Sequence, residues 1–113
     1  MCVLRAVINK KLKGTFGIRY DGSPAFSYWR AEELGINEER FSFVSKGNIL
    51  RGSVYFEKDK TPKALIVFFH GLGDGRASYI KEISLLAKQG YLVYAYDNTG
   101  CMESEGKGIV GLE

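Results

Sequence analysis

The sequence is poor in the residues that build metal, redox and disulfide-bonded sites. Its 113 residues include one histidine, His70, and two cysteines, Cys2 and Cys101, which lie near opposite ends of the chain. Zinc sites and redox pairs need closely spaced ligands, so the sequence predicts no metal and no cofactor. Both thiols are expected to be free, as in a reducing compartment, and the cytoplasm is the expected location.

Long apolar runs and a strong excess of one charge are also missing. No apolar run approaches the ~20 residues of a membrane span, and the segment from Met1 to Ile8, interrupted by Arg5, is too short for a signal-peptide core. Sixteen basic and thirteen acidic residues leave a net charge of +3, far from the basic stripe of a nucleic-acid-binding protein. We therefore expect a soluble, folded chain with no membrane span and no nucleic-acid partner.

The first forty residues have weak periodicity. Apolar residues recur at helical spacing and predict a short amphipathic helix that ends near Gly14; they are Val3, Leu4, Val7, Ile8 and Leu12. This stripe could dock on a partner or lie on a membrane surface, but it is short and lacks an aromatic anchor, so core packing is expected. The nearby Lys10, Lys11 and Lys13 are expected to form a solvated face. Residues 31–34 predict a further helical turn closed by Gly35.

The pattern changes at Phe41, where a β-hairpin is predicted. One strand begins at Phe41, residues 45–48 can turn the chain, and residues 49–56 return. A polar connector then leads to residues 64–69, six apolar residues without alternation. Such a run predicts a strand that is buried on both faces of a parallel sheet.

A helix and a further strand follow this apolar run. Residues 78–89 predict a helix with Ser78 as N-cap and Gly90 in the left-handed position after its end. Residues 91–96 predict the next strand. Strand, helix and strand form a βαβ unit with parallel strands and a right-handed crossover, so the fold class is α/β.

The loop between the first of these strands and the helix has the sequence His70-Gly71-Leu72-Gly73-Asp74-Gly75. Its three glycines can present backbone N–H groups at the carboxyl end of a strand, where open α/β sheets bind ligands. The spacing fits neither the dinucleotide fingerprint nor the P-loop, and Asp74 would repel a phosphate. A backbone N–H in such a turn can instead stabilise a developing oxyanion during acyl transfer.

Residues 41–113 resemble the N-terminal part of an α/β-hydrolase in the esterase, lipase and serine-aminopeptidase-like group. The matching features are the hairpin, the connector, the strand and loop at residues 64–73, the helix at residues 78–89, and Asp97, Gly100 and Ser104 of the segment after the next strand. The second glycine of the family's pattern in that segment is replaced by Met102. Residues 1–40 are then an N-terminal extension.

The resemblance implies a site and a strand order. The donor to the oxyanion is the backbone of Leu72, while His70 is a structural, hydrogen-bonded residue and the catalytic base lies near the C-terminus of the family's domains. The family's strand order of one, two, four, three, five implies an incomplete sheet here, an antiparallel hairpin followed by one βαβ unit. Its edge at residues 64–69 is open and could cause self-association.

Three further candidates have simpler explanations. Ser104 is one residue away from the G-x-S-x-G pattern, but no strand leads into it, so it is not expected to be a nucleophile. Cys101 has no base beside it and is expected to be a small apolar residue. Asp97 and Glu103 could be paired carboxylates, but charges on a surface loop are the expected explanation.

The serine nucleophile and its acid and base partners are expected beyond Glu113. The chain is therefore predicted to be a hydrolase fragment that carries the oxyanion loop, is inactive alone, and takes a small acyl ester or peptide substrate only if the domain is completed. The alternative is a non-catalytic protein-interaction module that uses the N-terminal stripe and the aromatic pair Tyr28 and Trp29.

Overall fold

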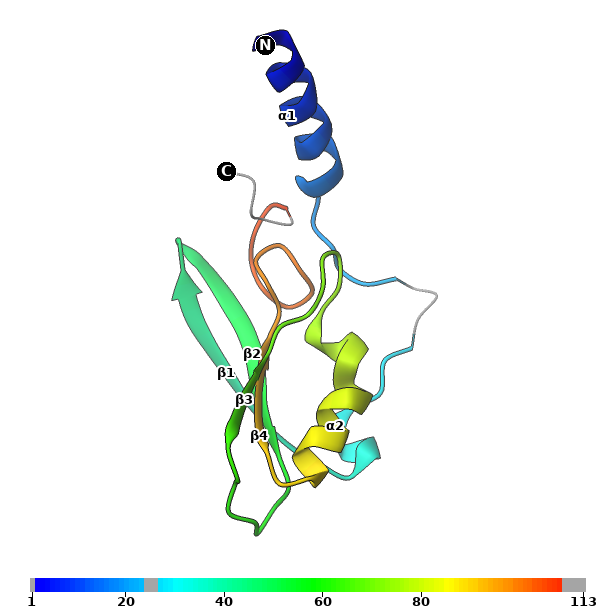
Figure 1. The fold of residues 1–113 in the computed structure, drawn as a ribbon, viewed down its shortest axis with the longest axis vertical. Coiled ribbons are helices and arrows are strands. Elements are labelled where there is room, and N and C mark those ends of the chain that lie inside the picture. Colours follow the sequence, from blue (N-terminus) through cyan, green and yellow to red (C-terminus); the bar gives the residue numbers. More distant parts are fainter. Residues whose placement is uncertain (1, 24–26, 109–113) are drawn as a thin grey trace.

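The computed structural model describes residues 2–23 and 27–108, and the side chains of Leu12, Lys13, Thr15 and Phe16 lie outside what it describes. The elements follow one another along the chain as drawn in Figure 1. They are α1 (Cys2–Phe16), η1 (Ala31–Leu34), β1 (Asn37–Ser45), β2 (Asn48–Phe56), β3 (Leu65–Phe68), η2 (Arg76–Tyr79), α2 (Ile80–Lys88) and β4 (Leu92–Tyr96).

The four strands form one sheet in the order β1-β2-β4-β3. β1 pairs with β2 and β2 with β4 antiparallel, while β3 and β4 are parallel. This arrangement confirms the predicted hairpin, the βαβ unit and the order one, two, four, three. The predicted start of the hairpin at Phe41 is wrong, because β1 begins at Asn37 and its first four residues already pair with β2. The hairpin turn is tight because Ser45 pairs with Asn48, and both residues between them have positive φ, 48° at Lys46 and 81° at Gly47. Such a two-residue turn matches the twist of the strands that it joins.

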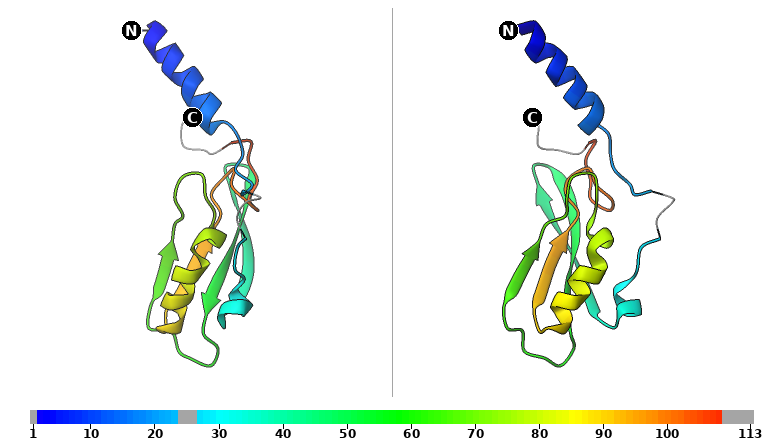
Figure 2. Two further views of the ribbon diagram at one scale, coloured as in Figure 1. Left: turned by 90° about the vertical axis from the view of Figure 1, so that its right-hand side faces the viewer. Right: turned by 45° about the vertical axis from the view of Figure 1, so that its right-hand side comes forward.

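The core lies between α2 and one face of the sheet, as the two views of Figure 2 show. Ile83 and Ala87 of α2 pack against Val93 and Ala95 of β4, and all four are fully buried. The predicted helix face is confirmed, and Gly90 has the expected left-handed conformation, with φ of 96°. Ala31 of η1 and Ile36 just before β1 also belong to this core.

The predicted start of the helix is wrong. α2 begins at Ile80 after the separate turn η2, and its N-cap position is Tyr79 rather than Ser78. The Ser78 hydroxyl instead donates a hydrogen bond to Oδ1 of Asp74. Local competition explains the difference, because a short polar side chain can bond a neighbouring carboxylate as readily as a helix N–H.

The prediction that the first strand of the βαβ unit is buried on both faces is also wrong. Along β3, Ile66 and Phe68 are half-buried, whereas Leu65, Val67 and the following Phe69 are exposed. Among the described residues α2 covers only one face of the sheet, so the apolar run has no cover on the other. We call this uncovered side, which carries Leu65, Val67 and Phe69, the open face.

Aromatic side chains of the neighbouring strands share the open face. The strand register places Val67 beside Tyr94, and the Phe41 and Tyr94 rings stack with their centroids 4.2 Å apart. Tyr96 meets the edge of Phe69, with 5.8 Å between the ring centroids. The rings therefore cover one another in part and leave β3, at the end of the sheet, as its most exposed apolar strand.

We expect the chain to self-associate through β3. An apolar edge strand with unpaired backbone groups pairs readily with another chain. Light scattering across a concentration series should show growing oligomers, and Val67→Lys should reduce them because a charge on an edge strand opposes pairing. Leu85→Lys, at an exposed position of α2, is the matched control and should change little. A monomer at all concentrations would contradict the expectation.

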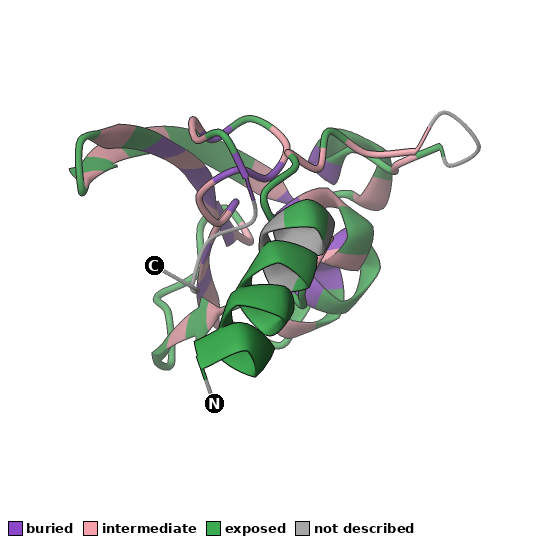
Figure 3. Cartoon of the chain, turned by 90° about the horizontal axis from the view of Figure 1, so that it is seen from above, coloured by how far each residue is buried: buried purple, intermediate pink, exposed green. Residues whose placement is uncertain are grey.

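The N-terminal helix differs from its prediction in length and in packing. α1 runs to Phe16, two residues beyond the predicted end, and every residue of it whose burial is described is exposed. Core packing of its apolar stripe is therefore wrong for Val3, Leu4, Val7 and Ile8. Figures 1 and 2 show α1 extending beyond the end of the sheet, and Figure 3 shows its uncovered surface. No helix in the described ranges is long and apolar enough to cross a membrane.

The residues that follow α1 in the chain explain the position of the helix. The Arg19 guanidinium donates hydrogen bonds to the carbonyl oxygens of Met102, Ser104 and Gly106 at 2.8 to 2.9 Å. The Tyr20 N–H donates to the Gly100 carbonyl at 2.9 Å. These bonds fix residues 19 and 20 on the loop after β4, at the end of the sheet, so the preceding helix points away from the core.

Candidate functional site

The glycine-rich loop, residues 70–75, leaves the carboxyl end of β3 and leads into η2. Leu72 lies on the outside of this loop, 69% exposed, and Gly73 has a positive φ of 65°. The Leu72 N–H has no acceptor among the residues that the structure describes. The loop thus presents an unpaired backbone donor at the strand end that the sequence singled out.

His70 holds the first end of this loop. Its Nδ1 lies 2.8 Å from the carbonyl oxygen of Gly71, and its Nε2 accepts a hydrogen bond from the N–H of Asn98 at 2.8 Å. This pair of contacts requires the proton on Nδ1. Both ring nitrogens are occupied by backbone and the side chain is buried, so His70 is a structural residue rather than a free base.

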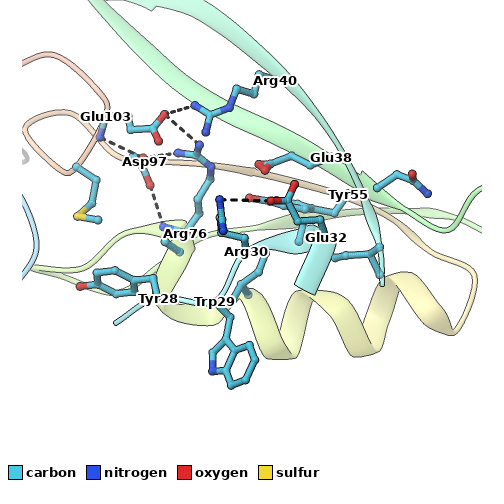
Figure 4. Close-up of a pocket in the computed structure, with 16 residues that line it drawn as sticks. Tyr28, Trp29, Arg30, Glu32, Glu38, Arg40, Tyr55, Arg76, Asp97 and Glu103 are labelled. Atoms are coloured by element: carbon cyan, nitrogen blue, oxygen red, sulfur yellow. Dashed lines mark hydrogen bonds and ion pairs between the residues drawn. The ribbon is translucent and has the colours of Figure 1, made fainter. Parts of the chain in front are cut away.

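Arg76 holds the other end, through Asp97. The Arg76 N–H donates to Oδ1 of Asp97 at 2.8 Å, and Nη1 of the same arginine is paired with Oδ2 (Figure 4). The side chains of Arg76 and Asp97 are only 6% and 1% exposed. Consecutive residues after β4, Asp97 and Asn98, therefore fix both ends of the glycine-rich loop.

The expectation that Asp97 is a surface charge is wrong. The carboxylate follows a buried strand directly and accepts a third hydrogen bond, from the N–H of Glu103 at 3.3 Å. A buried charge needs an ionic partner and hydrogen bonds, and Asp97 has both. One sequence feature points to this pairing, since Arg76 is the one basic residue between Ala64 and Ile80.

Glu103 extends the network to the surface, as expected for a loop carboxylate. Its Oε2 lies 3.2 Å from Nη2 of Arg76 and 2.8 Å from Nη1 of Arg40. Partial burial raises the pKa of Glu103, but the two guanidinium groups outweigh it and hold the pKa below its usual range. The charged form of Glu103 is thus favoured in the folded chain.

This shift predicts a small loss of stability in acid. A carboxyl whose folded pKa is lowered stabilises the fold above its unfolded pKa, about 4.3 for glutamate, and the stabilisation is lost as the pH falls through the folded pKa. Glu103→Gln should therefore flatten the fall of the urea midpoint between roughly pH 5 and pH 3. Glu39→Gln, at an exposed position of β1, is the control. Equal pH slopes in both variants would contradict the prediction.

Ser104 and Cys101 are structural. Ser104 is buried, and its hydroxyl donates to the Asp97 carbonyl at 2.5 Å and accepts from the Arg51 N–H at 2.9 Å. Cys101 is also buried, and burial raises the pKa of its thiol. Neither group is presented as a nucleophile, in agreement with the sequence analysis.

Met102 adopts the conformation that the missing glycine would favour. Its φ is 46°, in the left-handed region that side chains disfavour. The Met102 N–H donates to the Tyr20 carbonyl at 2.6 Å, and the Tyr20 N–H donates to Gly100. The segment behind α1 thus holds the turn in place, and the Met102 side chain packs against Gly75 at the end of the glycine-rich loop.

A charged cavity of about 690 Å³ lies beside this network, between η1, the hairpin strands and η2 (Figure 4). It combines three arginines with four acidic residues, Arg30, Arg40, Arg76, Glu32, Glu38, Asp97 and Glu103. The signs nearly balance, so the cavity favours neither anions nor cations. Sequence reasoning missed it because its walls come from segments 28–40 and 76–103, which meet only in the folded chain. In the described ranges no three acidic, histidine or cysteine side chains form a metal-binding group.

Comparisons with known proteins agree with this geometry. Residues 60–110 match the family model described as serine aminopeptidase, S33. A monoglyceride lipase of Rattus norvegicus is 38% identical over 56 residues, which are 50% of this chain and 18% of the lipase.

Solved structures give the same fold. An esterase of Pyrococcus furiosus superimposes with a TM-score of 0.56 at 20% identity, over 80% of this chain and 34% of the esterase. A second crystal form of that esterase gives 0.54 at 21% identity, over 77% and 34%. The chain thus spans about a third of the esterase and less of the lipase. By sequence and by fold, the chain is similar to the N-terminal part of an α/β-hydrolase.

Proposed function

We propose that residues 70–75 form one side of the oxyanion hole of a serine hydrolase and that the donor is the backbone N–H of Leu72. The observation that carries the proposal is the unpaired Leu72 N–H in an exposed loop at the carboxyl end of β3. An N–H that already had an acceptor in the fold could not serve a substrate oxygen.

The hydrogen bonds that anchor the two ends of the loop support this role. Donors to a developing oxyanion act best when their position is fixed before the reaction, because no free energy is then spent on reorganisation. His70 and Arg76 fix the two ends of the loop on Asn98 and Asp97. Residues 71–74 are thereby held between two hydrogen-bonded positions.

The reaction is two-step acyl transfer. A serine attacks the carbonyl carbon of an ester or amide, the carbonyl oxygen becomes negative, and the Leu72 N–H donates to it. The carbonyl re-forms as the bond to the alcohol or amine breaks, and that group leaves with the proton taken from the serine by the base. Water then attacks the acyl-serine and releases the carboxylic acid and the free serine. Ser104 and Cys101 are buried and do not serve as the nucleophile; in this proposal the attacking serine, its base and its acid belong to a completed domain. The lipase relative is named for monoglycerides, which makes an acylglycerol ester the first substrate to test.

The chain alone is therefore expected to show no hydrolase turnover. A short-chain nitrophenyl ester is a suitable probe because its release is measured directly as colour. Hydrolysis that survives Ser104→Ala and disappears in His70→Ala would overturn this expectation, since it would make His70 a working base in this chain.

The donor itself can be tested in the completed protein. The reading frame downstream of the Glu113 codon should encode a strand followed by G-x-S-x-G. In that longer polypeptide Leu72→Pro removes the N–H and should lower kcat by ~10²–10³, the usual loss for one oxyanion donor. Leu72→Ala keeps the N–H and is the matched control. Equal activity of the two variants would overturn the role of Leu72.

The second candidate function is a non-catalytic interaction module, and the exposure of α1 and of Trp29 favours it. Such a module would bind its protein partner through the N-terminal stripe and the aromatic pair Tyr28 and Trp29. Partner binding that is unchanged in Leu72→Pro would support it. The two functions thus give opposite results with the same variant.

A further inference from the structure

The charge of α1 is all of one sign. Its fifteen residues contain four of the sixteen basic residues of the chain and none of the thirteen acidic ones. The rest of the chain carries the opposite balance, with one more acidic than basic residue. The net positive charge of the chain therefore comes from its N-terminal helix.

The same helix exposes an apolar stripe. Val3, Leu4, Val7 and Ile8 are 78%, 59%, 49% and 46% exposed. Spacings of three and four residues place them along one side of a helix, and 100° per residue turns Arg5 to another side. Lys10 follows Val3 by seven residues, about two turns, and lies at the edge of the stripe. Lys11 lies one turn after Val7, where its long stem can follow the apolar side while its ammonium group reaches outward.

No part of the described chain covers this stripe. Residues 19 and 20 are hydrogen-bonded to the loop after β4, and α1 extends from there past the end of the sheet (Figure 1). Seen from above, every residue of α1 whose burial is described is exposed (Figure 3). The fold thus presents a basic, apolar helix away from its own core.

We propose that α1 binds the surface of a membrane that contains anionic lipids. The helix would lie in the plane of the interface, with Val3, Leu4, Val7 and Ile8 among the acyl chains and its basic side chains on the phosphate groups. The charge favours lipid over a protein partner, because it is uniformly positive along α1 and complements an anionic lipid surface. The proposal does not depend on the hydrolase assignment.

Vesicle sedimentation tests the proposal on the full chain. The protein should bind vesicles of phosphatidylcholine mixed with phosphatidylglycerol, and bind vesicles of phosphatidylcholine alone much more weakly. Raising the salt to about 0.5 M should release it, because exposed charges are then screened within a few ångströms. Lys10→Gln with Lys11→Gln should weaken binding by about tenfold or more, since each basic residue near such a surface contributes roughly fivefold.

One further variant tests the contribution of the apolar stripe to vesicle binding, and another is the control for the loss of basic charge. Val7→Asp should abolish binding, because it places a negative charge on the inserted side. Lys58→Gln with Lys88→Gln removes two exposed charges outside α1 and should bind as the wild type does. All of these positions are exposed, so circular dichroism should show the wild-type fold.

Three results would overturn the proposal. The first is that the protein does not bind the anionic vesicles. The second is that the α1 variants and the control variant lose vesicle binding equally. The third is that the protein does not bind vesicles but forms a protein complex that depends on Val7. The last result would assign the stripe to a second copy or to a protein partner. Loss of hydrolase function in the completed protein would leave vesicle binding unchanged.

Discussion

Replacing Asp97 with alanine is expected to lower the free energy of unfolding by about 3–5 kcal/mol, the usual cost of breaking a buried ion pair. The substitution leaves the Arg76 guanidinium, 6% exposed, with only the half-exposed Glu103 as its partner. Tyr55 lies beside the same guanidinium but carries no charge to pair with it. The substitution also removes the acceptor of the Arg76 and Glu103 backbone N–H groups. Urea denaturation followed by tryptophan fluorescence, through Trp29, measures the loss.

Two further variants make this result specific. Asp97→Asn keeps the volume and one acceptor oxygen but loses the charge, so its cost should lie between those of the wild type and Asp97→Ala. Asp97→Leu combined with Arg76→Met removes both charges and should recover much of the loss, because no unpaired ion remains buried. A cost below about 1 kcal/mol for Asp97→Ala, typical of exposed pairs, would show that the pair is not buried in solution.

Gly52→Ala is expected to cost about 3 kcal/mol, the upper end for an overpacked site. A Cβ at this position would overlap the carbonyl oxygen of Ala95 in β4 and lie 2.6 Å from both Cζ of Phe41 and Cβ of Tyr96. The backbone of a paired strand cannot move aside without breaking the β2–β4 ladder. Thermal unfolding should show a large fall in Tm.

Gly14→Ala is the matched control for this substitution. Gly14 lies within α1, and a Cβ there meets nothing within 4 Å. The same chemical change should be neutral or slightly stabilising, by up to about 1 kcal/mol of helix propensity. Equal effects at the two glycines would contradict the steric argument at Gly52.

The βαβ unit and the hairpin could be predicted from sequence because their signals are local. The apolar face of residues 80–87, Gly90 after the helix and the turn at residues 46–47 each act within a few positions. The position of the glycine-rich loop after a strand is also a local signal, whereas Leu72 within it is identified from the family resemblance.

The remaining features depend on contacts between distant segments. The apolar run at residues 64–69 shows which side chains of this strand can be buried. Whether another segment covers the second face of β3 depends on the rest of the polypeptide. The ion pair of Asp97 joins positions 21 residues apart. The direction of α1 depends on Arg19, whose three acceptors lie more than eighty residues away. No periodicity within one segment contains such information.

Because Asp97 and Asn98 anchor the two ends of the glycine-rich loop, the order in which the chain is synthesised affects when the loop can fold. Residues 70–75 leave the ribosome well before their two anchors, which come only after β4. Until β4 docks beside β3, the turn at Leu72 has only local contacts, such as those between His70 and Gly71 and between Asp74 and Ser78. The loop is therefore expected to mature together with the docking of the last strand, and a slip of β4 by one residue would distort the loop without altering a single atom of its own sequence.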